Sequence, residues 1–120
     1  MPRHHHVNLG VPTGGLEAEA TFLVDILGYH ELDPGDELRD RAHWFEAEDG
    51  SQVHLSVDPE HRPPNRAHTA VDYGGDLAGV RDRLAGSGWK FTSSDRVGLQ
   101  VIICKDAAGN MWELRGSPTS

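Results

Sequence analysis

The sequence has one cysteine, few basic residues and no long hydrophobic run, and each shortage argues against a class of protein. Cys104 cannot form an intramolecular disulfide, whereas small secreted domains usually contain several, so we expect a reducing, cytoplasmic setting. No segment approaches the roughly 20 apolar residues of a membrane-spanning helix, and the N-terminus lacks the basic-then-apolar pattern of a secretory signal. A membrane is therefore not expected as a partner.

Basic residues are outnumbered by acidic ones. There are 11 Lys and Arg against 19 Asp and Glu, which gives a net charge of -8 over 120 residues. Such a charge repels a phosphate backbone, so nucleic acid is not expected as a partner either. An acidic excess suits a cationic ligand or a bound metal, although it is more often only a solubility feature.

The chain repeats one order of hydrophobic patterns. Polar and apolar residues alternate in residues 6–11 and again in 68–73, which is the period of a strand with one buried face. Apolar residues at helical spacing follow in both halves, over residues 16–27 and 77–84. The patterns also predict the following shorter elements: strands near 29–32, 41–47, 52–57, 99–105 and 111–114, with a loop at 93–98.

These patterns predict an α+β protein of 120 residues with two tandem βαβββ modules. Module one covers about residues 4–57, and module two covers about 67–116. The segment between them, about 58–66, contains three prolines and no apolar period, so it is a connector. One such module cannot bury both faces of its sheet, so we expect two modules to pair, within one chain or between two chains.

Four potential metal ligands occupy corresponding positions of the two halves. His6 and His68 begin the opening strands, while His54 and Glu113 lie on the closing strands. Their neighbours along each strand are mostly apolar and should face the helices, so the four polar side chains should gather on the opposite surface. Imidazole and carboxylate groups suit a borderline divalent ion. The sequence therefore predicts a shared metal site, although any one of these histidines alone would be expected simply to face solvent.

With this repeat, the segments His6–Val11, His68–Val71 and Asp106–Leu114 resemble the vicinal oxygen chelate superfamily, which includes glyoxalases, bleomycin-resistance proteins and extradiol dioxygenases. The resemblance covers essentially the whole chain. It implies that the two modules form a half-open, cupped mixed sheet with helices on its outer face. It also implies one divalent ion (Ni, Zn, Mn, Co or Fe(II)) and a homodimer. The usual Asp-Pro of the last turn is replaced here by Asp106-Ala107.

The resemblance also implies roles for individual residues. Metal-dependent members of the superfamily have ligands at the positions of His6, His68 and Glu113. Glyoxalase I-like enzymes have a fourth ligand at the position of His54, where glutamate is common. Glu113 is also the candidate catalytic base, because a carboxylate beside a metal-bound substrate can accept its proton.

Candidate walls of a small-molecule pocket come from one strand in each half. In residues 41–47, either His43 with Phe45 or Trp44 faces the site, and the alternation does not choose between them. In residues 99–105, Gln100 and Ile102 are weaker candidates at alternate positions.

The leading functional hypothesis is a metal-dependent enzyme of glyoxalase I-like type, a lyase or isomerase that chelates a small substrate through adjacent oxygens. No glutathione-binding set is recognisable, so any thiol cosubstrate is unknown. The alternative is a non-catalytic, antibiotic-binding protein of bleomycin-resistance type, favoured by the acidic charge and by the aromatic residues Trp44, Phe45 and Trp112. Lesser alternatives are a ring-cleaving dioxygenase and a thiol transferase. Whether the site lies within one chain or across a dimer stays open.

Overall fold

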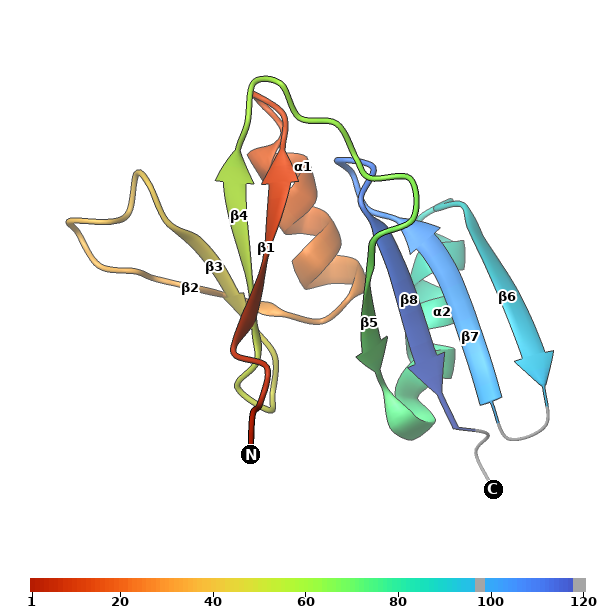
Figure 1. Ribbon diagram of the computed structural model, residues 1–120. Coiled ribbons are helices and arrows are strands. Elements are labelled where there is room, and N and C mark those ends of the chain that lie inside the picture. The colour runs from red at the N-terminus through yellow and green to blue at the C-terminus, as the bar shows by residue number, and fades with distance from the viewer. Residues whose placement is uncertain (97–98, 118–120) are drawn as a thin grey trace. The chain divides into compact units, whose positions relative to one another are not determined.

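The computed structural model of the protein describes residues 1–96 and 99–117. The chain divides into two compact units, Met1–Pro63 and Pro64–Ser120, and the division falls inside the predicted connector. Each unit contains one strand, one helical segment and three further strands, in that order (Figure 1). This is the α+β arrangement of two βαβββ modules that the repeat predicts.

The first unit forms a four-stranded mixed sheet in the order β1-β4-β3-β2. Strands β1 and β4 are parallel, and the other neighbouring strands are antiparallel. The elements of this unit are β1 (His6–Val11), α1 (Leu16–Thr21), a π-helical turn (Phe22–Ile26), β2 (His30–Leu32), β3 (His43–Glu46) and β4 (Gln52–Val57).

The second unit has the corresponding sheet order, β5-β8-β7-β6, with β5 and β8 parallel. Its opening strand is therefore again placed beside its closing strand. The elements of this unit are β5 (His68–Asp72), a short 3-10 turn (Gly74–Asp76), α2 (Leu77–Gly86), β6 (Phe91–Arg96), β7 (Leu99–Lys105) and β8 (Met111–Gly116).

The helix predicted over residues 16–27 is present, but its second half is π-helical. The amide of Leu27 donates to the carbonyl of Phe22, five residues earlier, at 3.1 Å. The wider turn lets Phe22, Ile26 and Leu27 all face the core, where each is at most 7% exposed. Gly28 then ends the helix with a φ of 88°, a left-handed conformation that glycine adopts without steric cost.

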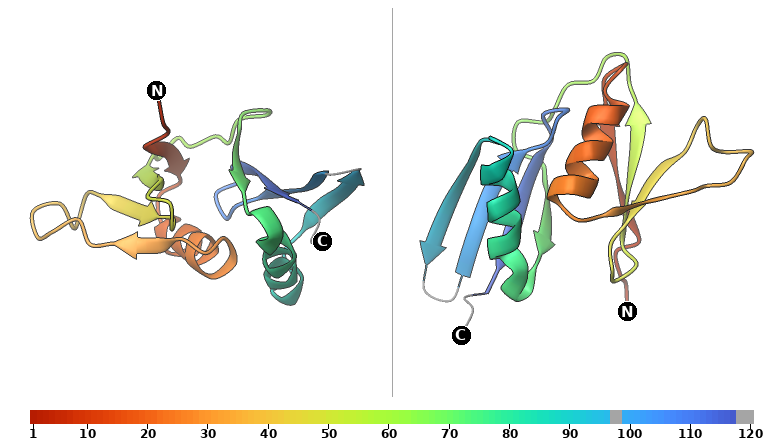
Figure 2. Two further views of the ribbon diagram at one scale, coloured as in Figure 1. Left: turned by 90° about the horizontal axis from the view of Figure 1, so that it is seen from below. Right: turned by 180° about the vertical axis from the view of Figure 1, so that it is seen from behind.

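Each helix covers one face of the sheet in its own unit (Figures 1 and 2). Alternate residues of the strands point toward the helix and are buried, as a period of two requires. On the helix-covered faces the buried strand residues include Val11, Phe45, Val53, Leu55, Ile102, Trp112 and Leu114. The opposite face of each sheet carries the polar residues. Among the described residues, no helix is long and apolar enough to cross a membrane.

The predicted loop at residues 93–98 is wrong where the structure describes it, because Phe91–Arg96 forms strand β6. Residues 97 and 98 lie outside the described part. Among the described strands β6 pairs with β7 alone, so it is an edge of the sheet. The side chains of Thr92, Ser93, Ser94 and Asp95 are exposed, so this strand shows no alternation between apolar and polar residues.

The turn between β7 and β8 is organised by the buried carboxylate of Asp106, which is 4% exposed. Its Oδ1 accepts hydrogen bonds from the amides of Ala108 (3.0 Å) and Asn110 (2.8 Å), and its Oδ2 accepts one from the indole Nε1 of Trp112 (3.0 Å). Because Trp112 immediately precedes Glu113, this carboxylate fixes the start of the strand that carries a candidate ligand.

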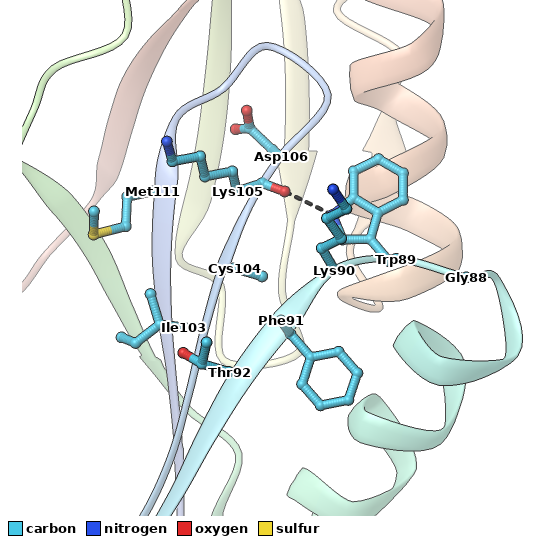
Figure 3. Close-up of a pocket in the computed structure, with 10 residues that line it drawn as sticks. All are labelled: Gly88, Trp89, Lys90, Phe91, Thr92, Ile103, Cys104, Lys105, Asp106 and Met111. Atoms are coloured by element: carbon cyan, nitrogen blue, oxygen red, sulfur yellow. Dashed lines mark hydrogen bonds between the residues drawn. The ribbon is translucent and has the colours of Figure 1, made fainter.

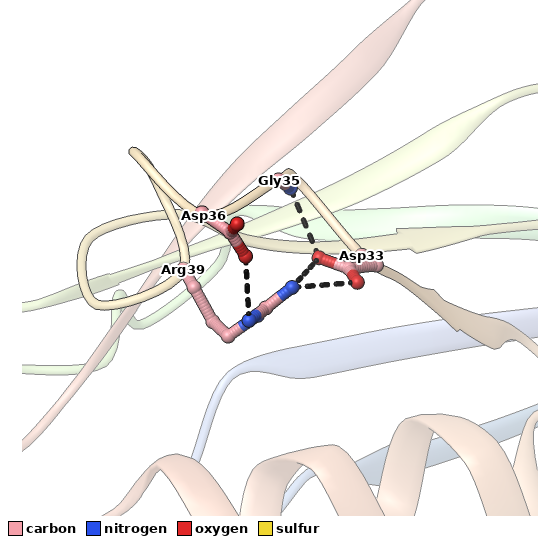
Figure 4. Close-up of polar contacts among 4 residues, drawn as sticks. All are labelled: Asp33, Gly35, Asp36 and Arg39. Carbon is pink, nitrogen blue, oxygen red and sulfur yellow. Dashed lines mark hydrogen bonds and ion pairs between the residues drawn. The ribbon is translucent and has the colours of Figure 1, made fainter.

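Arg39 forms two ion pairs within the connection between β2 and β3 (Figure 4). Its guanidinium lies 2.9 Å from a carboxylate oxygen of Asp33 and 2.9 Å from one of Asp36. The pKa of Asp33 is lowered below its ordinary value. The hydrogen bond from the amide of Gly35 makes the largest contribution, and the hydrogen bond from Arg39 makes the next largest. All these side chains are exposed, so the cluster orders a surface connection and contributes little to stability.

Replacement of Asp106 with alanine should destabilise the protein by about 2–4 kcal/mol, because three hydrogen-bond donors lose a charged acceptor in a buried turn. Urea unfolding of the purified variant measures this loss. Asp40→Ala, which removes an exposed carboxylate, is the matched control and should change stability by less than about 0.5 kcal/mol. Equal effects of the two variants would contradict the role given to Asp106.

Stability should fall at alkaline pH. Burial, followed by the nearby charge of Asp106, raises the pKa of Cys104 from 9.0 to about 12. The unfolded chain therefore releases the thiol proton at lower pH than the folded chain, and the free energy of unfolding declines as pH rises from about 9 toward 12. Urea unfolding across this range should show the decline. Cys104→Ala should flatten it without abolishing it, because burial also raises the pKa of Tyr29 to about 12.

Candidate functional site

The first unit brings His6 and His54 together on the polar face of its sheet. In the parallel pairing of β1 and β4, His54 is opposite Asn8, which lies two residues after His6 on the same face. The two imidazole rings are stacked, with centroids 3.9 Å apart and an interplanar angle of 10°. Two of the four predicted ligands are therefore neighbours within this unit.

A chain of hydrogen bonds sets the tautomer of His54. The carboxylate of Glu46 can only accept, so the amide nitrogen of Gln52 donates to it at 3.2 Å. The amide oxygen of Gln52 consequently faces His54, whose Nε2 lies 2.8 Å away and must donate. The unprotonated nitrogen of the neutral ring is then Nδ1. The pKa of His54 is lowered mainly because burial desolvates the ring, and to a smaller extent by the charges of His6 and His5. The lowered pKa favours the neutral form of the ring, which a metal ligand requires.

Trp44 covers the other side of the His54 ring. It is directly opposite His54 in the β3–β4 ladder, and the two rings are 5.3 Å apart. Of the two alternatives that the sequence left open, Trp44 is therefore the one on the face of His54. The prediction that His43 and Phe45 line the site is wrong, because both point to the opposite face of β3 and Phe45 is only 1% exposed.

The second unit brings His68 and Glu113 together in the corresponding way. In the parallel pairing of β5 and β8, Glu113 is opposite Ala70, which lies two residues after His68. The Nε2 of His68 is 3.7 Å from Oε1 of Glu113. The side chain of His68 is 41% exposed and that of Glu113 is 20% exposed, so both are accessible from the polar face.

Two further contacts orient this pair. The Nδ1 of His68 lies 2.9 Å from the carbonyl oxygen of Arg66, so Nδ1 donates and the neutral ring presents an unprotonated Nε2 toward Glu113. The guanidinium of Arg115 donates to Oε2 of Glu113 at 2.8 Å, which leaves Oε1 on the side of His68. A nitrogen lone pair and a carboxylate oxygen therefore face each other, an arrangement that a cation between them would stabilise.

The prediction that Gln100 and Ile102 line the pocket is wrong, because both lie on the helix-covered face of β7. They are opposite Gly116 and Leu114, and Ile102 is 0% exposed. The residue of β7 opposite Glu113 is Ile103. Residues 99–104 are apolar at nearly every position, so this stretch gives no alternation from which the correct face could be chosen.

Sequence reasoning also missed His61, in the connector. A Cβ atom placed on Gly10 would lie 2.8 Å from the Nδ1 of His61, so the imidazole occupies the space that a side chain at position 10 would fill. Gly10 lies on the same face of β1 as His6 and Asn8. A glycine inside an alternating strand is the signal that could have indicated such a close approach.

Each unit supplies two of the four predicted ligands. Within the described residues of either unit, no three His, Cys, Asp or Glu side chains are grouped closely enough to hold an ion. The donors themselves suit a divalent metal: two imidazoles in the first unit, and one imidazole with one carboxylate in the second.

The sequence matches no protein-family model and no curated protein. Solved structures do match it. A protein from Bacillus anthracis described as a glyoxalase family protein has a TM-score of 0.84 at 23% identity, over 98% of this chain and 96% of that chain. A glyoxalase/dioxygenase from Nostoc punctiforme has a TM-score of 0.81 at 24% identity, over 98% and 92% of the two chains.

The fosfomycin resistance protein FosX from Listeria monocytogenes has a TM-score of 0.76 at 16% identity, over 98% of this chain and 94% of that chain. The chain therefore has the same fold as these structures, which is the fold that the sequence resemblance predicted. Its structural neighbours include proteins described as glyoxalase, dioxygenase and fosfomycin-resistance proteins. A variant of FosX was crystallised with Mn(II) and 1S,2S-dihydroxypropylphosphonic acid, so one neighbour of this fold binds a divalent metal.

The two candidate ligand histidines on β4 and β5, His54 and His68, should differ in tautomer. Histidine-detected proton–nitrogen spectra at about pH 7.5, where most imidazoles are neutral, should show His54 protonated at Nε2 and His68 protonated at Nδ1. Gln52→Leu should remove the preference of His54 for the Nε2-protonated tautomer. The tautomer of His68 should stay the same, so its signals serve as the control within the same spectrum. The same tautomer at both histidines would contradict the hydrogen-bond assignments.

Proposed function

We propose that the protein is a divalent-metal-dependent enzyme of glyoxalase I-like type, a lyase or isomerase, with His6, His54, His68 and Glu113 as its metal ligands. The observation that carries the proposal is the repeated geometry of the ligands. In both units the histidine that opens the first strand lies diagonally across from the ligand on the last strand. FosX, a neighbour with the same fold, was crystallised with Mn(II), which supports a metal-dependent function.

The side chains fit a divalent ion in their chemistry. The 3.7 Å between His68 Nε2 and Glu113 Oε1 is shorter than twice a typical ligand bond of about 2.1 Å, so one ion can contact both atoms. The stacked rings of His6 and His54 are face to face, so one must turn for both to reach the same ion. His6 is exposed and can make that turn.

A bound ion would act as a Lewis acid toward two adjacent oxygens of a substrate. Glu113 is the group positioned to move a proton, since Arg115 holds Oε2 and leaves Oε1 on the side of the ligands. Trp44 lies against His54 and shields that ring from water. The substrate is a small molecule, and we propose a homodimer as the assembly.

Antibiotic sequestration without catalysis is the second candidate function. A neighbour from Frankia is described as a glyoxylase/bleomycin resistance protein/dioxygenase domain, at 19% identity and a TM-score of 0.76. Sequestration needs no metal ligands, so His68→Ala separates the two functions. It should abolish metal binding and turnover in an enzyme, whereas it should leave the affinity of a sequestering protein for its antibiotic intact.

Protein purified without an affinity tag or chelating resin should contain close to one divalent ion per site by elemental analysis. Glu113→Ala should lower metal affinity by at least about tenfold, because an anionic ligand is lost. Glu17→Ala, on an exposed face of α1, removes a carboxylate of the same type and should leave metal content unchanged. Absence of metal, with none taken up on titration, would exclude the proposed enzyme.

The same assay determines whether one chain or two supply the ligands. A variant with His6→Ala and His54→Ala is mixed with a variant that carries His68→Ala and Glu113→Ala, after partial unfolding and refolding to exchange subunits. If a site combines the first unit of one chain with the second unit of its partner, mixed dimers regain one intact site. If each site lies within one chain, the mixture binds no metal.

A further inference from the structure

The second unit contains a hollow outside the four proposed ligands. It has a volume of about 530 Å³, which is large enough for a small organic molecule (Figure 3). The hydrogen bond from Trp89 Nε1 to the carbonyl of Lys105, 2.7 Å long, closes one side. The hollow is lined by Gly88, Trp89, Lys90, Phe91, Thr92, Ile103, Cys104, Lys105, Asp106 and Met111.

Only part of the lining of this hollow belongs to the face of the sheet that carries Glu113, because the half-buried Phe91 lies on the other face. Cys104 and Asp106 are each 4% exposed, so they contribute mainly backbone to its surface. Thr92, Ile103 and Met111 project to the other side of the strands from Phe91 (Figure 3). These three side chains, with Lys105, form the wall of the hollow on the face of Glu113.

The hollow adjoins the candidate ligands. In the strand ladders, Ile103 is directly opposite Glu113, and Met111 is directly opposite His68. Side chains directly opposite each other in neighbouring strands have Cβ atoms about 5 Å apart. A molecule that contacts Ile103 and Met111 is therefore within reach of the oxygen and nitrogen that face each other at 3.7 Å.

The chemistry of the wall is apolar with positive charge at its edge. Ile103 and Met111 are half-buried, whereas Lys90 and Lys105 are exposed. These two lysines are the only lysines of the chain, and both line this hollow. In a protein with a net charge of -8, this concentration of ammonium groups makes the hollow locally favourable for an anion.

The internal repeat shows that this wall has diverged from its counterpart. The ladder positions equivalent to Met111 and Lys105 are Gln52 and Glu46 in the first unit. There the amide and the carboxylate form the hydrogen-bond chain that orients His54. In the second unit Glu113 is oriented by Arg115 instead. In the second unit these positions are thus occupied by the apolar Met111 and the cationic Lys105, and neither residue orients Glu113.

We propose that this hollow binds the body of the substrate, and that the substrate is a small organic anion with an aliphatic or aromatic group. The apolar group lies against Ile103 and Met111, and the anionic group is paired with Lys105 and Lys90. The identity of this molecule as the substrate rests on the proposed function. Binding of an anion of this class to the hollow does not depend on the proposed function, because the wall contains no proposed metal ligand.

The test uses hexanoate as the probe and hexanamide as its neutral counterpart. The chain has only two methionines, Met1 and Met111, so carbon-13 labelling of methionine methyl groups gives one reporter in the hollow and one in the exposed N-terminus. With EDTA present to exclude metal, hexanoate should shift the Met111 signal to saturation and leave Met1 unchanged. Hexanamide should bind more weakly.

Lys105→Gln and Lys90→Gln should each weaken hexanoate binding about twofold to fivefold, the range expected for an exposed charge pair. They should leave hexanamide binding unchanged. Arg62→Gln removes an exposed positive charge in the first unit and should have no effect. An unmoved Met111 signal, or equal affinity for hexanoate and hexanamide, would overturn the proposal. Because metal is absent, neither result depends on whether the metal site exists.

Discussion

The parallel pairing of the first and last strand in each unit is the constraint on which the candidate site depends. It places residues that are 48 positions apart, His6 and His54, in one patch, and it does the same for His68 and Glu113. The side-chain period of a strand is two, so a register shift of one residue would turn a candidate ligand toward the helix. The buried Val53, Leu55, Trp112 and Leu114 prevent that shift, because it would expose them. The hydrophobic core therefore fixes the polar face.

The two units use the same backbone for different chemistry. In the first, an imidazole is held between Trp44 and His6 and is oriented by an uncharged amide. In the second, a carboxylate is held by a guanidinium on its own strand. The candidate donors of the two units therefore combine imidazoles, which bind a metal as neutral rings, with a carboxylate, which binds it as an anion. Divergence of the repeat thus adjusts the donor set without changing the fold.

Much of the fold could be predicted from the sequence, because most strands bury one face and so alternate clearly. The faces of His6, His54, His68 and Glu113 follow from the apolar neighbours of each residue. Prediction failed where alternation was missing. Strand β7 is apolar on both faces, so its pattern does not distinguish Ile102 from Ile103, and the exposed edge strand β6 has the polar sequence of a loop. The orienting roles of Gln52, Arg115 and Asp106 depend on contacts across strands and turns, which a pattern along one strand does not encode.

The location of both lysines has a consequence for chemical modification of the protein. Apart from the terminal amine, Lys90 and Lys105 are the only primary amines of the chain, and arginine does not react with ordinary acylating reagents under mild conditions. Acylation of lysine neutralises its charge, so an acyl donor that modifies this chain at a side-chain amine changes the electrostatics of the hollow in the second unit. Lysine acetylation would thus act on this surface alone and leave the other cationic side chains, all of them arginines, charged.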